Sequence, residues 1–167
     1  MTGPAAWGAS AVARFPLQIQ NSNLRLLHDY WDIVRGDRAF PASSEVEVVD
    51  LPVSPGSVML VNVAPNQMAY TLHWVGTDYV LWFRRESTGL QLEELPPTPN
   101  TVPFAEMLRR CADNGLPQAR TLPAIPFLNV PAADLLVLPL GGVDGKVSRL
   151  LVGCAFDRKR RGLQVIG

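Results

Sequence analysis

Residues 22 to 35 carry apolar side chains at helical spacing, and Gly36 follows where a helix would end. Ser22 and the neighbouring Asn residues favour a helix start there, so we predict a helix from Ser22 to Arg35. Arg25, His28, Asp29, Asp32 and Arg35 fall on its polar side. Its apolar side would hold Leu24, Leu26, Leu27, Tyr30, Trp31, Ile33 and Val34. This apolar arc spans about 180°, wider than the roughly 100° that one contact surface needs, so the helix is expected to contact two surfaces.

Alternating apolar and polar residues predict several strands further along the chain. Residues 57–63 and 68–75 form one antiparallel pair, and 118–125 is a plausible short strand. Residues 133–142 and 146–156 give the clearest hairpin, around the Asp144-Gly145 turn. Its inner face would hold Leu150, Val152, Cys154 and Phe156, and on 68–75 one face would hold Met68, Tyr70, Leu72 and Trp74. Pro139 lacks an N–H for a strand ladder, so we expect a bulge or a missing bond there.

A second amphipathic helix is predicted from Thr101 to Gly115, with Pro103 in its first turn. Its apolar stripe comprises Phe104, Met107, Leu108, Cys111 and Ala112. Short helical turns are expected between residues 77 and 95. The element order predicts an α+β fold, an antiparallel sheet with helices on one face.

The length and charge of the chain limit the remaining possibilities. A chain of 167 residues fits one domain, and we place a flexible arm at 1–20, the domain at 21–157 and a basic tail at 158–167. The 15 basic and 15 acidic residues cancel, and no apolar run approaches the roughly 18 residues of a membrane span. The first 16 residues do not resemble a secretory signal, so a cytoplasmic location is expected. The tail residues Arg158, Lys159, Arg160 and Arg161 fit a solvated segment or a contact with an acidic partner or phosphate, and lack the interleaved aromatics of a nucleic-acid site.

Motifs that carry chemistry are missing from the sequence. It has no GxSxG, HExxH or Gly-rich phosphate loop with Lys, so we expect no catalytic residues. Cys111 and Cys154 lack metal-ligand spacing and are interpreted as buried free thiols, and no metal site is expected. His28 and His73 are interpreted as solvated or hydrogen-bonded side chains.

Three stretches, in this order, resemble the PAS domain family, in particular stand-alone bacterial PAS-like proteins. They are "LLHDYWDIVRGDRAFP", "YTLHWVGTDYVLWFRRESTGLQLEEL" and "LLVLPLGGVDGKVSRLLVG", and the resemblance covers roughly residues 22 to 156. It implies a five-stranded antiparallel sheet with the 101–115 helix across its concave face and an N-terminal flanking helix. Family members are typically sensory or regulatory modules in signal transduction, which bind a small ligand, a partner protein or each other.

The resemblance also implies where binding would occur. Haem-binding relatives use a His on or beside the long helix, and flavin-binding relatives an Asn-Cys-Arg motif before it; both are missing here, which disfavours haem and photochemical flavin. A small apolar ligand would lie among Leu72, Trp74, Trp82, Met107, Cys111 and Cys154, unless these side chains simply fill the core. A homodimer or a signalling partner would contact Leu24, Leu27, Tyr30, Trp31 and Val34 on the flanking helix. The alternative is a small cone-shaped α+β enzyme or small-molecule-binding protein.

Overall fold

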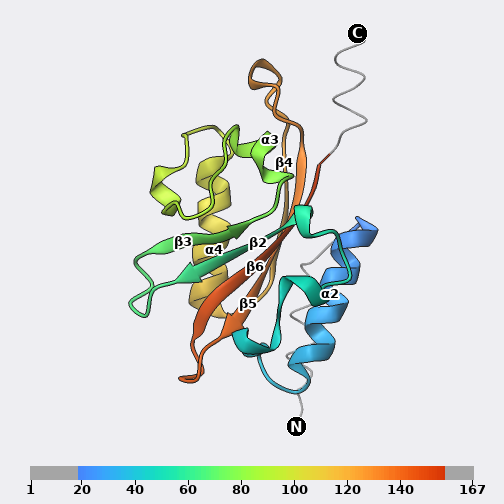
Figure 1. The fold of residues 1–167 in the computed structure, drawn as a ribbon, viewed down its shortest axis with the longest axis vertical. Helices are drawn as coiled ribbons and strands as arrows, with labels where there is room; N and C mark the ends of the chain where they lie inside the picture. The colour runs from blue at the N-terminus through green and yellow to red at the C-terminus, as the bar shows by residue number, and fades with distance from the viewer. Residues whose placement is uncertain (1–18, 157–167) are drawn as a thin grey trace.

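A five-stranded antiparallel sheet forms the centre of the protein (Figure 1). The structure is a computed structural model, and it describes residues 19–156. The strands are β2 (Val58–Val63), β3 (Tyr70–Val75), β4 (Gln118–Leu122), β5 (Ala133–Gly141) and β6 (Val147–Phe156). Their spatial order is β3-β2-β6-β5-β4. The helices are α2 (Ser22–Arg35), α3 (Tyr79–Phe83) and α4 (Thr101–Asn114). The α+β class is confirmed, whereas the basic tail and most of the expected N-terminal arm lie outside the described residues.

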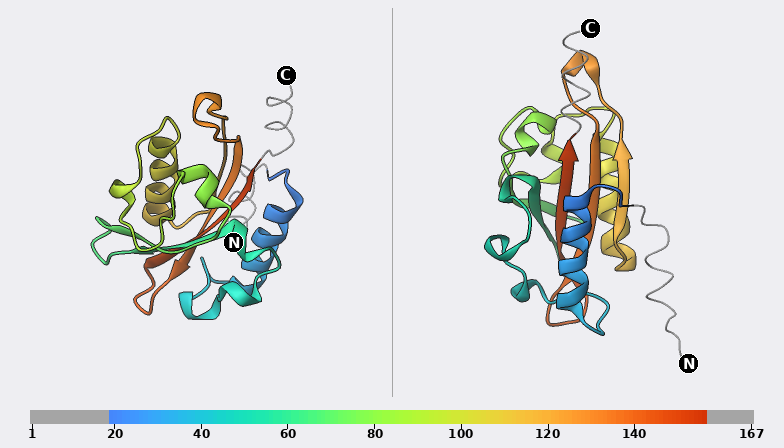
Figure 2. Two further views of the ribbon diagram at one scale, coloured as in Figure 1. Left: turned by 45° about the horizontal axis from the view of Figure 1, so that its top comes forward. Right: turned by 90° about the vertical axis from the view of Figure 1, so that its right-hand side faces the viewer.

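Helices cover both faces of this sheet, so the expectation of helices on one face is wrong. Helices α3 and α4 lie on one face and α2 on the other (Figures 1 and 2). The two apolar cores that result are called the α4-side core and the α2-side core below. Strand β5 is buried along nearly its whole length because both faces of the sheet are covered there.

The sequence signals at the ends of α2 act as predicted. The side chain of Asn21 accepts hydrogen bonds from the backbone N–H groups of Asn23 (3.0 Å) and Leu24 (3.1 Å). Gly36 follows the last turn with φ of 61°, a conformation that glycine adopts without strain. The limits of α2 can therefore be explained by local residues alone.

The side of α2 that packs against the sheet, however, differs from the side that the sequence predicted. His28 is buried, and its ring centroid lies 5.7 Å from that of Trp31. The expectation that His28 lies on the polar side is therefore wrong. Leu26 and Ile33, in contrast, are 49% and 79% exposed. Helix α2 uses only part of its apolar arc against the sheet.

A β-bulge changes the face of Trp74. Leu60 lies opposite Trp74 and Val61 opposite Leu72, so His73 is the extra residue in β3. Trp74 packs against the α2-side core, whereas Leu72 belongs to the α4-side core. The expected common face of Tyr70, Leu72 and Trp74 is wrong at its last member because strict alternation breaks at the bulge.

Pro139 does not interrupt β5. It lies opposite Leu150 in regular register, and the irregularity falls one step later, between Leu140 and Gly141. Pro139 also lies beyond the part of β5 that pairs with β4, which ends at Val137. Its carbonyl accepts a hydrogen bond from Nε1 of Trp31 at 2.9 Å. The side of Pro139 that lacks an N–H therefore faces α2 rather than β6, and no ladder bond is lost, contrary to the expectation.

Candidate ligand site and docking surfaces

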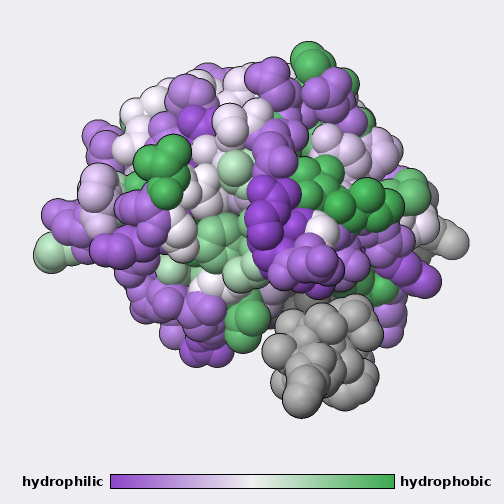
Figure 3. Space-filling view, turned by 90° about the horizontal axis from the view of Figure 1, so that it is seen from below, coloured by the Kyte–Doolittle hydropathy of each residue, from purple (hydrophilic) through white to green (hydrophobic). Residues whose placement is uncertain are grey.

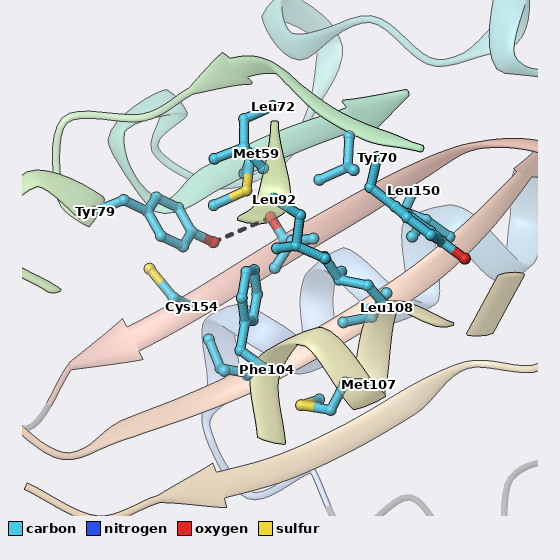
Figure 4. Packing of buried hydrophobic residues seen from close by; sticks show 14 of the residues in the cluster. Met59, Tyr70, Leu72, Tyr79, Leu92, Phe104, Met107, Leu108, Leu150 and Cys154 are labelled. Carbon is cyan, nitrogen blue, oxygen red and sulfur yellow. Dashed lines mark hydrogen bonds between the residues drawn. The ribbon is translucent and has the colours of Figure 1, made fainter. Parts of the chain in front are cut away.

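Five of the six residues expected to line a ligand hollow lie together in the α4-side core. Figure 4 shows three of them, Leu72, Met107 and Cys154. The five come from β3, α3, α4 and β6, and all are at most 5% exposed: Leu72, Trp82, Met107, Cys111 and Cys154. The sixth, Trp74, lies on the other face of the sheet for the reason given above. The structure thus brings together residues up to 82 positions apart, from Leu72 to Cys154.

The aromatic part of this core is built around α3. This helix has only five residues, and Arg84 ends it in the left-handed region with φ of 62°. The indole of Trp82 meets Phe104 of α4 edge-on at 5.3 Å between ring centroids, and lies 6.4 Å from Phe156 of β6. Edge-to-face contact is a favourable aromatic geometry. Trp82 is therefore held between the long helix and the sheet.

The indole nitrogen of Trp82 is buried without a hydrogen-bond partner. Among the residues described, Trp82 Nε1 is the buried side-chain nitrogen or oxygen for which this holds. A buried donor left unpaired costs about 1–3 kcal/mol, and such groups are rare in native proteins. The nitrogen is thus a polar group to which a small acceptor could bind.

Tyr79 shows the opposite behaviour in the same core. Its hydroxyl, which points into the core in Figure 4, lies 3.1 Å from the carbonyl oxygen of Ser57 and 3.3 Å from that of Val152. Burial, with the Cys154 thiol beside it, raises the pKa of Tyr79 well above its ordinary value of 10.0. The Tyr79 hydroxyl therefore stays protonated and donates its hydrogen bond within the protein.

Both cysteines of this core are buried, and neither is part of a disulfide. Cys111 Sγ lies 3.8 Å from the carbonyl oxygen of Val137. Burial raises the pKa of the Cys111 thiol far above its ordinary value of 9.0, so it stays neutral and weakly nucleophilic. No cluster of three or more metal-ligating side chains occurs in the described part of the chain.

Charged side chains are kept out of both cores. Among residues 19–156, the buried polar side chains are those of His28, Ser87 and Asn100, and none of them is a carboxylate, Lys or Arg. The α4-side core therefore offers apolar contact, weak thiol donors and one free indole N–H. This chemistry suits binding of a small molecule better than proton transfer.

The residues expected to form an interface on α2 divide into two groups. Leu24, Leu27 and Trp31 are 4%, 0% and 3% exposed and pack against the chain's own sheet. Tyr30 and Val34 are partly exposed. Together with Leu26 and Ile33, Tyr30 forms a stripe at i, i+4 and i+7 on the outer side of the helix, which we call the outer stripe of α2. Any partner of α2 would meet this stripe.

Two surface hollows that the sequence did not indicate lie beside β4. One, of about 340 Å³, lies between the start of α2 and the strand pair β4–β5. The other, of about 250 Å³, lies between α4 and β4. Seen along the long axis of the molecule, the described surface is mixed, and hydrophilic side chains divide the hydrophobic ones into small patches (Figure 3). Within the described range, no helix is both long and apolar enough to cross a membrane.

Comparison with known proteins adds no relative to this description. No model of a protein family matches the chain, and no curated protein matches it either.

Proposed function

We propose that this protein is a PAS-like sensory or regulatory module that acts through protein–protein contacts, modulated by a ligand or constitutive, and has no catalytic output of its own. The antiparallel sheet with α4 across one face and α2 on the other supports this proposal, as do the three sequence stretches that resemble the family. A cytoplasmic location and the lack of a nucleic-acid partner belong to the same proposal.

The unpaired N–H of Trp82 carries the ligand-binding part of the proposal. The donor lies in the core to which the resemblance assigns the ligand. A small apolar molecule with one hydrogen-bond acceptor, such as a carbonyl group, would satisfy this nitrogen and keep the rest of its surface against aromatic and thiol groups. Haem and photochemical flavin stay disfavoured for the sequence reasons given above.

The outer stripe of α2 supports the contact part of the proposal. Leu26 and Ile33 expose apolar surface on a helix whose opposite side is fixed to the sheet. A signal that changes the position of α2 on the sheet would change the surface that a partner or second copy meets.

The rival function is a small α+β enzyme. Such an enzyme needs an acid–base pair that faces its cavity. The burial pattern of residues 19–156 places every carboxylate outside the two cores, so no observation favours this function over binding.

Native mass spectrometry of the full chain, purified without added ligand, tests the proposal. We expect a mass excess that disappears on denaturation and that is reduced or lost in Trp82→Phe, which removes the N–H donor and keeps an aromatic, though smaller, ring at this position. Trp74→Phe, on the other face of the sheet, is the matched control and should retain the excess. A bare mass for the wild type, with Trp82→Phe as stable as the wild type or more stable, would contradict ligand binding in this core.

A further inference from the structure

The two edges of the sheet differ in how the chain covers them. At the β3 edge, the Leu72 N–H donates to the Leu90 carbonyl at 2.8 Å, and the Gly89 N–H donates to the Leu72 carbonyl at 2.7 Å. An extended segment of the chain itself therefore pairs with this edge. At the other edge, β4 pairs with β5 alone among the described residues. The outward N–H and C=O groups of β4 have no backbone partner within that range, and free strand edges are templates for another strand.

Both sides of β4 are hollowed rather than filled. Helix α2 lies over β6 and β5, so that β4 stands beside it at the edge of the sheet (Figure 2, right). The hollow on that side includes Leu24, Ala119 and Asp134 in its lining. The hollow on the opposite side includes Met107 of α4 together with Gln118 and Arg120 of β4. A strand added to β4 would send successive side chains alternately toward these two hollows.

The two hollows differ in net charge. Arg110 and Arg120 line the α4-side hollow, and neither forms an ion pair or a hydrogen bond within the described residues. Glu106 is the one carboxylate in that lining, which leaves a net charge of +1. The α2-side hollow is lined by Asp134 and by Arg120, so its net charge is zero. Asp134 Oδ1 accepts a hydrogen bond from the Thr121 hydroxyl at 2.5 Å, and Arg120 lies opposite Leu135, a residue of the α4-side core. An added strand would thus be favoured with acidic residues on the α4 side and uncharged ones on the α2 side.

We propose that the free edge of β4 binds an extended peptide segment of a partner protein, with an acidic residue at every second position. Main-chain pairing with β4 would supply affinity, and the two guanidinium groups would select the acidic side chains. This inference rests on the proposed function, because it names the partner of an interaction module. The α4-side hollow, however, shares only Met107 with the α4-side core, and neither hollow shares a residue with the outer stripe of α2.

Charge also distinguishes this occupant from a second copy of the chain. Arg120 is the central residue of the five in β4. Two β4 strands paired antiparallel along their full length would set Arg120 against Arg120 of the second copy, and like charges directly opposite each other destabilise a strand pair. Arginine on a short edge strand, with Pro117 and Pro123 flanking it, is also typical of edges protected from self-association.

Fluorescence anisotropy with a labelled peptide of alternating Glu and Thr, about nine residues long, tests the charge selection on the full chain. We expect saturable binding that Arg120→Glu and Arg110→Glu each weaken about tenfold or more. Glu106→Gln should strengthen it about two- to threefold, since it removes the one carboxylate of that lining. Lys146→Glu in the β5–β6 hairpin makes the same charge change elsewhere and should alter the affinity by less than about twofold. Equal affinity for Arg120→Glu and wild type, or no saturable binding, would overturn the proposal.

Backbone methylation of the same peptide separates strand addition from simple charge attraction. Only alternate N–H groups of an added strand face β4. Two peptides, N-methylated at the Glu or at the Thr positions, should therefore differ: one loses binding and the other retains it. Equal binding of both would overturn strand addition. A chain dimer that disappears in Arg120→Glu would instead assign the edge to a second copy and also overturn the proposal. None of these outcomes affects the mass-spectrometric test of the core.

Discussion

The indole of Trp31 fastens α2 to the sheet by two interactions. The side chain is 3% exposed, and its Nε1 donates to the carbonyl of Pro139 at 2.9 Å across the α2-side core. The same hydrogen bond pairs a strand carbonyl that has no neighbour in β4. The role of Trp31 that the structure shows is therefore docking within the chain.

Replacement of Trp31 by Phe tests this role. The change removes the N–H and leaves the Pro139 carbonyl unpaired, so we expect the free energy of unfolding to fall by about 1–3 kcal/mol, measured by urea denaturation. Ile33→Ala, on the 79% exposed position of the same helix, should change it by less than about 0.5 kcal/mol. Equal effects of the two substitutions would contradict the docking role.

The buried thiol of Cys111 and the buried hydroxyl of Tyr79 make the free energy of unfolding depend on pH in the alkaline range. The pKa of each group is raised in the folded chain from ordinary values of 9.0 and 10.0. Above about pH 9 the unfolded chain loses protons that the folded chain keeps, so the unfolding free energy falls as pH rises. The contribution is fully present below about pH 8.

Denaturation at pH 8, 9 and 10 checks this dependence. Each group contributes a slope of up to about 1.4 kcal/mol per pH unit once its unfolded form is deprotonated. In the unfolded chain the thiol of Cys111 loses its proton at a lower pH than the hydroxyl of Tyr79 does. Cys111→Ala should therefore flatten the plot of unfolding free energy against pH between pH 9 and 10, although it lowers stability at pH 8. A wild-type curve as flat as that of Cys111→Ala would argue against a protonated thiol in the fold.

At the scale of the elements, the close approach of α2 to β6 depends on Gly153. A Cβ atom at this position would lie 2.6 Å from Leu27 Cδ2 and 3.0 Å from Leu24 Cδ2. Two leucine side chains can thus lie directly on the strand because it has no side chain there.

Gly153→Val should therefore lift α2 from the sheet. We expect a loss of about 1–3 kcal/mol in unfolding free energy from overpacking, and faster amide hydrogen exchange in α2. Combined with Leu27→Ala, the loss should be smaller than the sum of the two single changes, because the second change makes room for the new methyl groups. If the two losses of unfolding free energy simply add, the strain in Gly153→Val does not come from contact with Leu27.

At the scale of the whole molecule, one sheet separates a core that would bind a ligand from a core that holds a helix. Strands β5 and β6 contribute residues to both cores, so they connect the two faces. A ligand that repacked the α4-side core would thus shift the position of α2 on the sheet through the shared strands. The outer stripe of α2 would move with the helix.

Ile33→Glu tests whether this stripe joins two copies of the chain. If the homodimer forms there, the substitution should convert it to a monomer in light scattering after size exclusion, with the melting temperature nearly unchanged since the position is exposed. Val49→Glu replaces another exposed apolar side chain, 87% exposed, and is the matched control. If the Ile33→Glu variant has the same mass in solution as the wild type, the outer stripe of α2 is not a homodimer interface.

The sequence by itself determined the elements and the class of fold. Asn21 or Ser22 and Gly36 bound the first helix, Gly115 ends the long one, and alternation with an Asp-Gly turn marks the last hairpin. These signals act within a few residues of the chain, which is why they can be recognised without the fold. The sequence also placed together five of the six residues expected to line the ligand hollow, because helical and strand periods select the buried side of each element.

Only the tertiary structure decided which other element each face of a helix or strand packs against. The bulge at His73 turned Trp74 to the other core, Trp31 met the carbonyl of Pro139, and His28 was buried beside Trp31. Likewise, within residues 19–156 no segment pairs with the outer edge of β4, whereas the segment around Leu90 pairs with the β3 edge. All of these depend on strand register and on contacts between segments far apart in the chain, and a local hydrophobic period contains no information about either.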